Sequence, residues 1–188
     1  MESQVLIAVE ETLNRSAPDV EAAAKVEDGL VKLIDQQLGQ SISERPSTIY
    51  EDTVFYIKRL GNRRFLRKNG QVKEAAFYQY AYIDKSTWSG LKWDQITPSK
   101  KTVLKIALAL KLSESETEEL LAKAHQGFEP EDYQDRLILA LIELRKGPYQ
   151  LDVDGIVEVL EYYQKNGPKP FDSIYDTPEM IAQRKKNF

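Results

Sequence analysis

One short segment of the chain carries ammonium and hydroxyl groups at a spacing that suits contact with an anionic surface. If residues 85–93 form a helix, its polar side chains share one face: Lys85, Ser86, Ser89 and Lys92. Trp88 and Leu91 then share the opposite face, where they would pack against the protein. Lysine and serine side chains donate hydrogen bonds to phosphate oxygens and to base edges, so the polar face is a candidate binding surface.

The residues around this segment predict the helices that would position it. Asp84 is placed to cap a helix at Lys85, and residues 71–82 read as a preceding helix. The apolar side of that preceding helix consists of Val72, Ala75, Ala76 and Tyr78. A longer helix follows Ser99, and its apolar stripe consists of Val103, Ile106, Ala107 and Leu110. Two short helices joined by a tight turn and followed by a longer helix are typical of a helix-turn-helix.

The stretch from Asn69 to Leu112 resembles the lambda-repressor-like (Xre-type) helix-turn-helix domains of bacteria and their phages. The resemblance rests on the turn, on two buried positions of the second helix and on the approach to the next helix: Tyr78, Ala81, Ile83, Asp84, Trp88, Leu91, Pro98, Ser99, Lys100 and Thr102. A narrower likeness, over roughly residues 50–165, is to a bacterial subgroup with additional C-terminal helices. The resemblance implies an all-α fold.

The resemblance also implies a sequence-specific transcriptional regulator whose 85–92 helix enters the major groove of double-stranded DNA. Lys85, Ser86 and Ser89 would then lie at base edges. The phosphate-binding residues would be Gln71, Lys73, Lys92, Lys100 and Lys101. The alternative is a non-enzymatic adaptor, inhibitor or accessory subunit of a bacterial or phage complex, built on a repurposed helix-turn-helix. The exposed face of the 85–92 helix lacks Arg, Asn and Gln, the usual bidentate base readers, which favours this alternative.

The charge of the chain is unevenly distributed. The formal net charge is −4, yet residues 50–112 hold 13 lysines and arginines against 5 acidic residues, a net charge of +8. Residues 1–49 and 113–188 carry net charges of −5 and −7. Because lysine and arginine neutralise phosphates and release counterions, the pattern favours a nucleic-acid-binding surface on the central segment. The alternative is chance variation among solvated faces.

The first 46 residues predict a helical hairpin and a linker. A first helix carries Val5, Leu6, Val9 and Leu13 on its apolar side. A second helix is predicted between a cap at Ser16 and a stop at Gly39, with a stripe of Ala23, Val26, Leu30, Leu33, Ile34 and Leu38. The hairpin either packs on the chain's own core or forms a surface for a homodimer or a protein partner. The C-terminal extension, residues 127–188, is the other candidate for such a surface.

A further helix is predicted from Ile49 to Lys68. It would bury Val54, Ile57 and Leu60 and break near Gly61. Its last part is basic and contains Arg63, Arg64, Arg67 and Lys68. This run is either a phosphate-contacting arm or an exposed, charged helix end.

The remainder of the chain is also predicted to be helical. A capping box from Ser113 to Glu116 starts a helix that ends near His125. Three more helices are predicted: one after Glu129-Pro130, one from Asp154-Gly155 to Gly167, and a short one at 177–179. The predicted all-α chain thus divides into a hairpin and linker (1–46), a helix-turn-helix domain (47–126) and a C-terminal extension (127–188). Aromatic residues of the extension are expected to be exposed: Tyr162, Tyr163, Phe171 and Tyr175.

Few residues point to catalysis or metal binding. The chain has no cysteine and a single histidine, which excludes thiolate and multi-histidine metal sites. Asp152 and Asp154 resemble the start of a calcium loop, but the later ligand positions do not fit, so helix capping is expected. We therefore expect no enzyme activity, cofactor or metal. No window approaches the roughly 20 apolar residues of a membrane helix, and no signal peptide is evident, so we expect a cytoplasmic protein without a membrane partner.

Overall fold

The computed structural model describes residues 2–15, 47–145 and 151–175. Within these ranges the chain forms eight helices and no strand, apart from one isolated bridge between Leu66 and Val72. The helices are α1 (Glu2–Arg15), α3 (Ile49–Leu60), α4 (Glu74–Tyr80), α5 (Lys85–Lys92), α6 (Lys100–Ala109), α7 (Glu114–Lys123), α8 (Tyr133–Leu144) and α9 (Val153–Asn166). The predicted all-α fold class is confirmed. The predicted helices at 16–39 and 177–179 lie outside the described residues.

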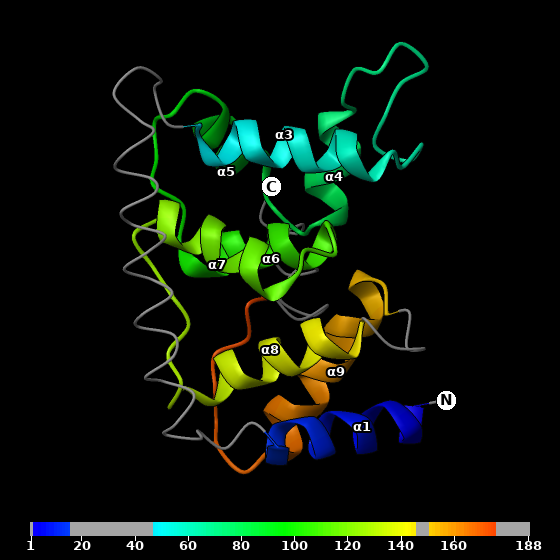
Figure 1. Ribbon diagram of the computed structural model, residues 1–188, viewed down its shortest axis with the longest axis vertical. Coiled ribbons are helices and arrows are strands. Elements are labelled where there is room, and N and C mark those ends of the chain that lie inside the picture. The colour runs from blue at the N-terminus through cyan, green and yellow to red at the C-terminus, as the bar shows by residue number, and fades with distance from the viewer. Residues whose placement is uncertain (1, 16–46, 146–150, 176–188) are drawn as a thin grey trace, which may run out of the picture.

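The helices are arranged in three tiers along the long axis of the molecule (Figure 1). One end consists of α3, α4 and α5, the middle of α6 and α7, and the other end of α8, α9 and α1. Helix α1 packs against α8, with Val9 fully buried, and the Tyr163 hydroxyl of α9 donates to the Leu6 carbonyl at 3.1 Å. The first helix of the predicted hairpin therefore packs on the chain's own core. No helix of the described part is long and apolar enough to cross a membrane.

Helix α6 lies at the centre of the core because it is apolar around most of its circumference. Val103, Ile106 and Leu108 are 0% exposed. A helix that is apolar all round has to be covered on every side, and α6 is packed against α7 and lies between the two outer tiers. Its N-terminus is capped by Ser99, whose hydroxyl accepts from the Thr102 N–H.

A buried carboxylate joins α6 to α8. Asp135 is 2% exposed, and its Oδ2 lies 2.5 Å from the Lys100 ammonium at the start of α6. The same oxygen accepts the Glu129 N–H at 2.6 Å. Burying a carboxylate is unfavourable unless it is paired and hydrogen-bonded, and Asp135 meets both conditions.

Several predicted details differ from the structure. Helix α3 ends at Leu60, because Gly61 adopts the left-handed conformation at φ 61° and closes the helix. Ile57 is buried as predicted, whereas Leu60 is 41% exposed and Val54 is half-buried. Helix α9 begins at Val153 rather than at Asp154-Gly155.

The start of α9 is set by Asp152, whose side chain accepts the Gly155 N–H at 3.0 Å. The expectation of helix capping at this position is thus confirmed.

Four aromatic residues of the C-terminal extension were expected to be exposed. Tyr162 is exposed, but Tyr163 and Tyr175 are each only 3% exposed and Phe171 is half-buried. Tyr163 is on the buried face of α9, where its hydroxyl reaches α1. Phe171 and Tyr175 pack against the hydrophobic core because the segment after α9 folds back along the molecule.

The Asp135 contact leads to a stability prediction. Asp135→Ala should lower the free energy of unfolding by about 2 to 4 kcal/mol, because it removes the close carboxylate partner of the Lys100 ammonium and the acceptor of the Glu129 N–H. The matched control is Asp172→Ala, which removes the partner of Lys101 but from a side chain that is 92% exposed. Its effect should stay within about 0.5 kcal/mol. Urea denaturation followed by circular dichroism measures both, and equal losses would contradict the role assigned to Asp135.

Candidate nucleic-acid interface

The predicted pair of short helices is present as α4 and α5, joined by residues 81–84. Four apolar side chains hold the pair together and are almost fully buried: Phe77, Ala81, Trp88 and Leu91. Burial of Trp88 and Leu91 was predicted, but on α4 the prediction was wrong in part. The helix begins at Glu74, Ala75 is exposed, and Phe77 is the residue that it buries.

The turn between the helices contains a residue in an unusual conformation. Tyr82 has φ 54°, in the left-handed region that favours glycine, which such turns often contain. The Ile83 N–H donates to the Tyr78 carbonyl at 2.8 Å, and the Tyr82 hydroxyl donates to Asp154 at 2.8 Å. The contact with α9 thus helps to hold a turn conformation that the tyrosine itself does not favour.

The start of α5 is capped by Asp84. Its carboxylate accepts from the Thr87 N–H at 2.8 Å, from the Thr87 hydroxyl at 2.6 Å and from the Ser86 hydroxyl at 2.5 Å. Burial raises the pKa of Asp84, but these hydrogen bonds outweigh it and lower the pKa to about 2. Asp84 is therefore ionised at neutral pH, and the Ser86 hydroxyl points back to it rather than outward.

Glu74 joins α3, α4 and α5 through three hydrogen bonds. Its carboxylate accepts from the Tyr50 hydroxyl at 3.1 Å, from the Trp88 indole N–H at 3.0 Å and from the Lys92 ammonium at 2.8 Å. Burial raises the pKa of Glu74, whereas the hydrogen bonds from Lys92, Trp88 and Tyr50 lower it more, so the net pKa lies below its usual value. Trp88 is also enclosed by aromatic rings, with centroids of Tyr50 and Phe77 each at 5.4 Å.

The far end of α5 is packed tightly by the following loop. A Cβ atom added at Gly90 would lie 2.9 Å from the end of the Ile96 side chain, which would have to shift to make room. Trp93, directly after α5, is 66% exposed and contributes little to the core.

The basic run after α3 forms a short hairpin, not a helix end. We call residues 63–73 the basic hairpin. Its two sides are joined by hydrogen bonds from the Arg67 N–H to the Gln71 carbonyl and from the Lys73 N–H to the Phe65 carbonyl, both 2.8 Å. Gly70, at φ 77°, closes the turn by donating to the Arg67 carbonyl at 3.0 Å.

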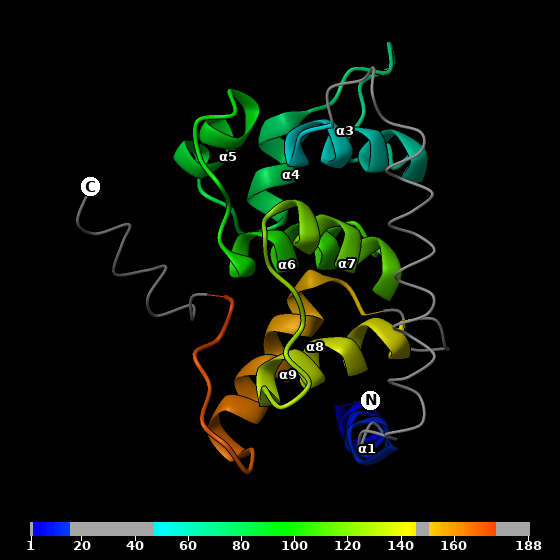
Figure 2. The ribbon, with the colours of Figure 1, turned by 60° about the vertical axis from the view of Figure 1, so that its left-hand side comes forward.

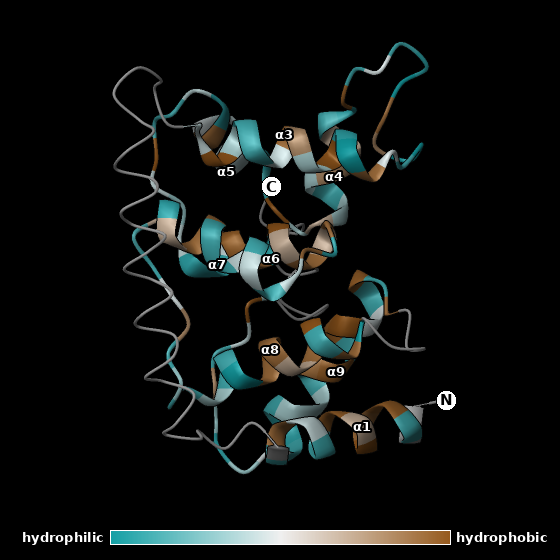
Figure 3. Ribbon diagram, viewed as in Figure 1, coloured by the Kyte–Doolittle hydropathy of each residue, from teal (hydrophilic) through white to brown (hydrophobic). Residues whose placement is uncertain are grey.

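The basic hairpin is anchored at its base and polar at its tip. Phe65 is 1% exposed and packs edge-on against Phe77 with a centroid distance of 5.5 Å. The tip is hydrophilic and projects from the end of the molecule (Figure 3). Its exposed basic residues are Arg63, Arg64, Arg67 and Lys68. The Arg64 guanidinium lies over the Tyr80 ring at 4.2 Å, which ties the hairpin to α4.

Five basic side chains elsewhere in the described ranges are paired with carboxylates. The pairs are Arg59–Glu116, Lys92–Glu74, Lys100–Asp135, Lys101–Asp172 and Lys123–Asp52. Lys85 and the four exposed cations of the basic hairpin form no ion pair with another residue that the structure describes. Four exposed cations of residues 50–112 thus lie within six positions of one another on the basic hairpin. Helix α5 and the basic hairpin lie on either side of α4 (Figure 2).

The eight residues expected to bind nucleic acid occupy three places. Lys85, Ser86, Ser89 and Lys92 are exposed on α5, as expected, and Gln71 and Lys73 belong to the basic hairpin. Lys73 is half-buried and donates to the Arg63 carbonyl at 3.0 Å. Lys100 and Lys101, at the start of α6, instead face carboxylates of the C-terminal half.

Two features were not foreseen from the sequence. The roles of Glu74 and Asp135 depend on partners 14 to 35 positions away, and no local pattern indicates them. The basic hairpin did have a local signal. Asn69-Gly70 between the apolar residues Leu66 and Val72 is the most common type of short-hairpin turn sequence.

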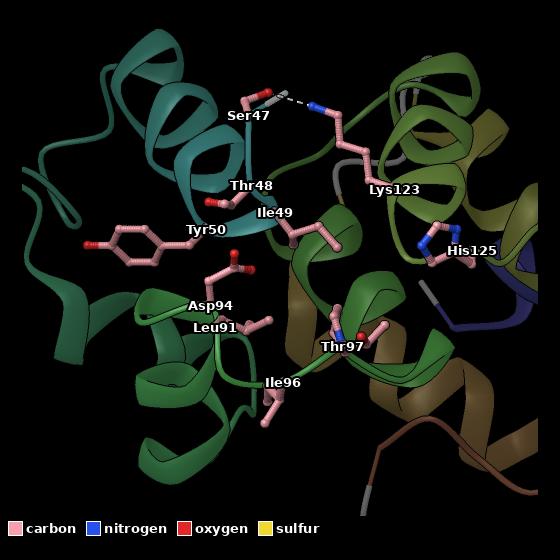
Figure 4. A pocket seen from close by; sticks show the side chains of 11 residues that line it. Ser47, Thr48, Ile49, Tyr50, Leu91, Asp94, Ile96, Thr97, Lys123 and His125 are labelled. Atoms are coloured by element: carbon pink, nitrogen blue, oxygen red, sulfur yellow. Dashed lines mark hydrogen bonds between the residues drawn. The ribbon is translucent and has the colours of Figure 1, made fainter. Parts of the chain in front are cut away.

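A pocket of about 310 Å³ lies behind α5, between the start of α3 and the end of α7 (Figure 4). Asp94 and His125 come from opposite walls of the pocket, and Lys123 is bound to Ser47 and Asp52 at its rim. In the part of the chain described here, no group of three or more His, Cys, Asp or Glu side chains is arranged to hold a metal ion.

Comparisons with protein-family models, with curated proteins and with solved structures found no match for this chain. The candidate interface is therefore assessed from its own geometry and charge.

Glu74 makes the α3–α5 unit sensitive to acid. Its pKa is lower in the folded protein than the value of 4.5 of an unperturbed glutamate. The stabilisation is therefore complete above pH 4.5 and is lost as the pH falls through the lower, folded-state pKa. Glu74→Gln should be less stable than the wild type by roughly 1 to 2 kcal/mol at pH 7, and this gap should shrink below pH 4.5. Chemical unfolding of both proteins from pH 7 to pH 3 measures the gap, and a gap independent of pH would refute the assignment.

Proposed function

We propose that this chain binds double-stranded DNA with the end of the molecule that contains α5 and the basic hairpin. The observation that carries the proposal is the group of exposed cations without a carboxylate partner at this end of the molecule. Lys85 and the four exposed cations of the basic hairpin have no carboxylate partner among the described residues, whereas five basic residues elsewhere do. Unpaired, exposed cations can neutralise phosphates without first breaking an internal ion pair.

In this proposal α4 and α5 act as a helix-turn-helix of the lambda-repressor-like kind, and α5 enters the major groove. Lys85 and Ser89 are exposed on one face of α5, while Trp88 and Leu91 hold the other face against the protein. That arrangement places donors where base edges would lie. Regulation of transcription is the expected role of such a protein.

The basic hairpin would provide a second contact, to the phosphate backbone. Its guanidinium and ammonium groups extend from a turn whose backbone is held by hydrogen bonds at 2.8 to 3.0 Å. Charges on a preformed turn lose less conformational freedom on binding than charges on a flexible arm. Lys92, Lys100 and Lys101 would contribute less than the sequence suggested, because each is held by a carboxylate of the chain itself.

The test is binding to random duplex DNA in a salt series. With about five phosphate contacts, the logarithm of the affinity should fall against the logarithm of the salt concentration with a slope on the order of −4 to −5. Arg67→Glu with Lys68→Glu should weaken binding by at least about tenfold and flatten the slope by about two, since two cation–phosphate contacts are lost. Fluorescence anisotropy of labelled duplexes measures both quantities.

The matched control is Lys111→Glu with Lys169→Glu, which changes the charge equally at exposed positions outside α5 and the basic hairpin. It should leave affinity and slope nearly unchanged. If both double variants weaken binding alike, overall charge rather than this surface attracts the DNA. A wild-type protein that binds no duplex at low salt would remove the proposal.

A separate pair of substitutions tests α5. Lys85→Glu with Ser89→Glu should abolish the preference for a selected DNA sequence, because the double variant puts two carboxylates into the groove. Both positions are exposed, so each substitution should lower the free energy of unfolding by no more than about 0.5 kcal/mol. Selection of preferred sequences from a random pool, followed by competition binding, provides the measurement. Retained sequence preference in a folded variant would show that α5 is not the reading helix.

Exposed apolar side chains at the opposite end of the molecule support a second candidate function, which is binding to another protein chain. A groove of about 660 Å³ lies between α1 and α9, lined in part by Val5, Val159 and Tyr162. Ile7 beside it is 53% exposed and Tyr162 is 41% exposed. We assign a second copy of this chain to the groove, because helix-turn-helix proteins read two half-sites as dimers.

Light scattering tests the docking assignment. The wild type should have the mass of two chains at micromolar concentration, and Ile7→Glu with Tyr162→Glu should have the mass of one, because the substitutions place charges in an apolar interface. A wild-type mass of one chain over the accessible concentration range would overturn this assignment while leaving DNA binding untouched.

A further inference from the structure

The tripeptide Lys-Asn-Gly occurs twice in the chain, at residues 68–70 and at residues 165–167. An asparagine followed by glycine is prone to spontaneous deamidation, in which the backbone nitrogen of the glycine attacks the side-chain carbonyl carbon of the asparagine. Glycine has no side chain to shield that nitrogen. Because their immediate neighbours are the same, Asn69 and Asn166 differ mainly in their surroundings in the folded protein.

Asn69 lies at the exposed tip of the basic hairpin, which projects from the end of the molecule (Figure 3). Its side-chain carbonyl oxygen accepts the Gln71 N–H at 3.2 Å, so the carbonyl faces the backbone that follows it. A donor at this oxygen stabilises the negative charge that develops there during attack. The Gly70 N–H is held by a single turn bond, to the Arg67 carbonyl at 3.0 Å, at an exposed position where local opening costs little.

Asn166 is the last residue of α9, and its side chain is directed away from the following glycine. Its amide nitrogen Nδ2 donates to the Tyr162 carbonyl at 3.0 Å, one turn back along the helix. The Gly167 N–H donates to the Tyr163 carbonyl at 2.8 Å. A Cβ atom added at Gly167 would lie 2.3 Å from that carbonyl oxygen and 3.1 Å from the Tyr133 hydroxyl, whereas one added at Gly70 would meet nothing within 4 Å. Release of the Gly167 nitrogen therefore requires unwinding a helix end that is packed against its neighbours.

We propose that Asn69 is a site of spontaneous deamidation and that the fold protects Asn166. The Gly70 nitrogen loses its proton and forms a bond to Cγ of Asn69. The bond from Cγ to the side-chain nitrogen breaks, and that nitrogen takes up a proton and leaves as ammonia. Water then opens either C–N bond of the resulting cyclic imide, which gives aspartate or isoaspartate. Water is the co-reactant, and no oxidation or reduction takes place.

The reaction changes the charge of the basic hairpin. Either product replaces a neutral amide by a carboxylate directly beside Lys68, on a hairpin with four exposed cations. Isoaspartate also lengthens the backbone path of the turn that Gly70 closes. Because phosphates repel a carboxylate, deamidation weakens the contact of the hairpin with DNA. This consequence rests on the proposed DNA binding, whereas the reaction itself does not.

The test is incubation of the folded full-length chain in mildly alkaline buffer, followed by pepsin digestion and mass spectrometry of the two tripeptide sites. The amide-to-acid mass shift should accumulate at least about tenfold faster at Asn69 than at Asn166, because the hairpin tip opens more readily than the helix end. In guanidinium chloride the two rates should agree within about twofold, since unfolding removes the difference in surroundings. A folded-state ratio no larger than the unfolded-state ratio overturns the proposal, as does a folded chain in which Asn69 does not react.

Substitutions separate the reaction from its consequence. Asn69→Gln should show no product at this position, because its longer side chain has to close a larger ring, and the rate at Asn166 should stay the same. Asn69→Asp reproduces one product and should weaken binding to random duplex DNA by about two- to fivefold and flatten the salt slope by about one.

The matched control is Asn166→Asp, the same change in the other tripeptide, which should leave the DNA affinity nearly unchanged. If the two aspartate variants bind DNA alike, the assigned consequence is wrong. A wild-type protein that binds no duplex removes the proposed function and this consequence, while the mass measurement still decides whether Asn69 is the modified residue.

Discussion

The structure depends on the burial of α6. This helix is apolar on nearly all sides, so no arrangement that leaves one of its faces in water would be stable. Helix α7 covers it within the middle tier, and the outer tiers lie beyond it on both sides. Lys100 and Lys101 at its N-terminus carry charges into this environment, and Asp135 and Asp172 of the C-terminal half neutralise them.

Internal pairing, more than the number of basic residues, determines where the surface is positively charged. The central segment has a net charge of +8, yet several of its cations are neutralised by carboxylates from other helices. The exposed cations that remain include Lys85 on α5 and four residues of the basic hairpin. A preformed hairpin anchored by Phe65 also differs from a charged helix end, because its backbone hydrogen bonds hold the basic side chains at a defined place relative to α4.

The C-terminal helices contribute directly to the α4–α5 turn. Tyr82 adopts a backbone conformation that a side chain disfavours, and its hydroxyl, carbonyl and ring contact Asp154, Lys105 and Tyr175 respectively. These contacts explain why a tyrosine can occupy a position where glycine is the common choice.

The sequence by itself determined the features that depend on neighbours within one or two helical turns. Capping by Asp84, Ser99 and Ser113 follows from a side chain and an N–H two or three positions away, and burial of Trp88 and Leu91 follows from helical periodicity. The helix-turn-helix reading remains an interpretation of those local patterns.

Only the tertiary structure decided which charges are neutralised and which aromatic residues are covered. Glu74 and Asp135 have roles set by groups brought together from separate helices, and sequence spacing carries no information about such encounters. Leu60 is exposed and Tyr175 is buried for the same reason. A residue at a helix end or in a connecting segment is covered or uncovered by the path of the rest of the chain, because periodicity specifies a face only within a helix.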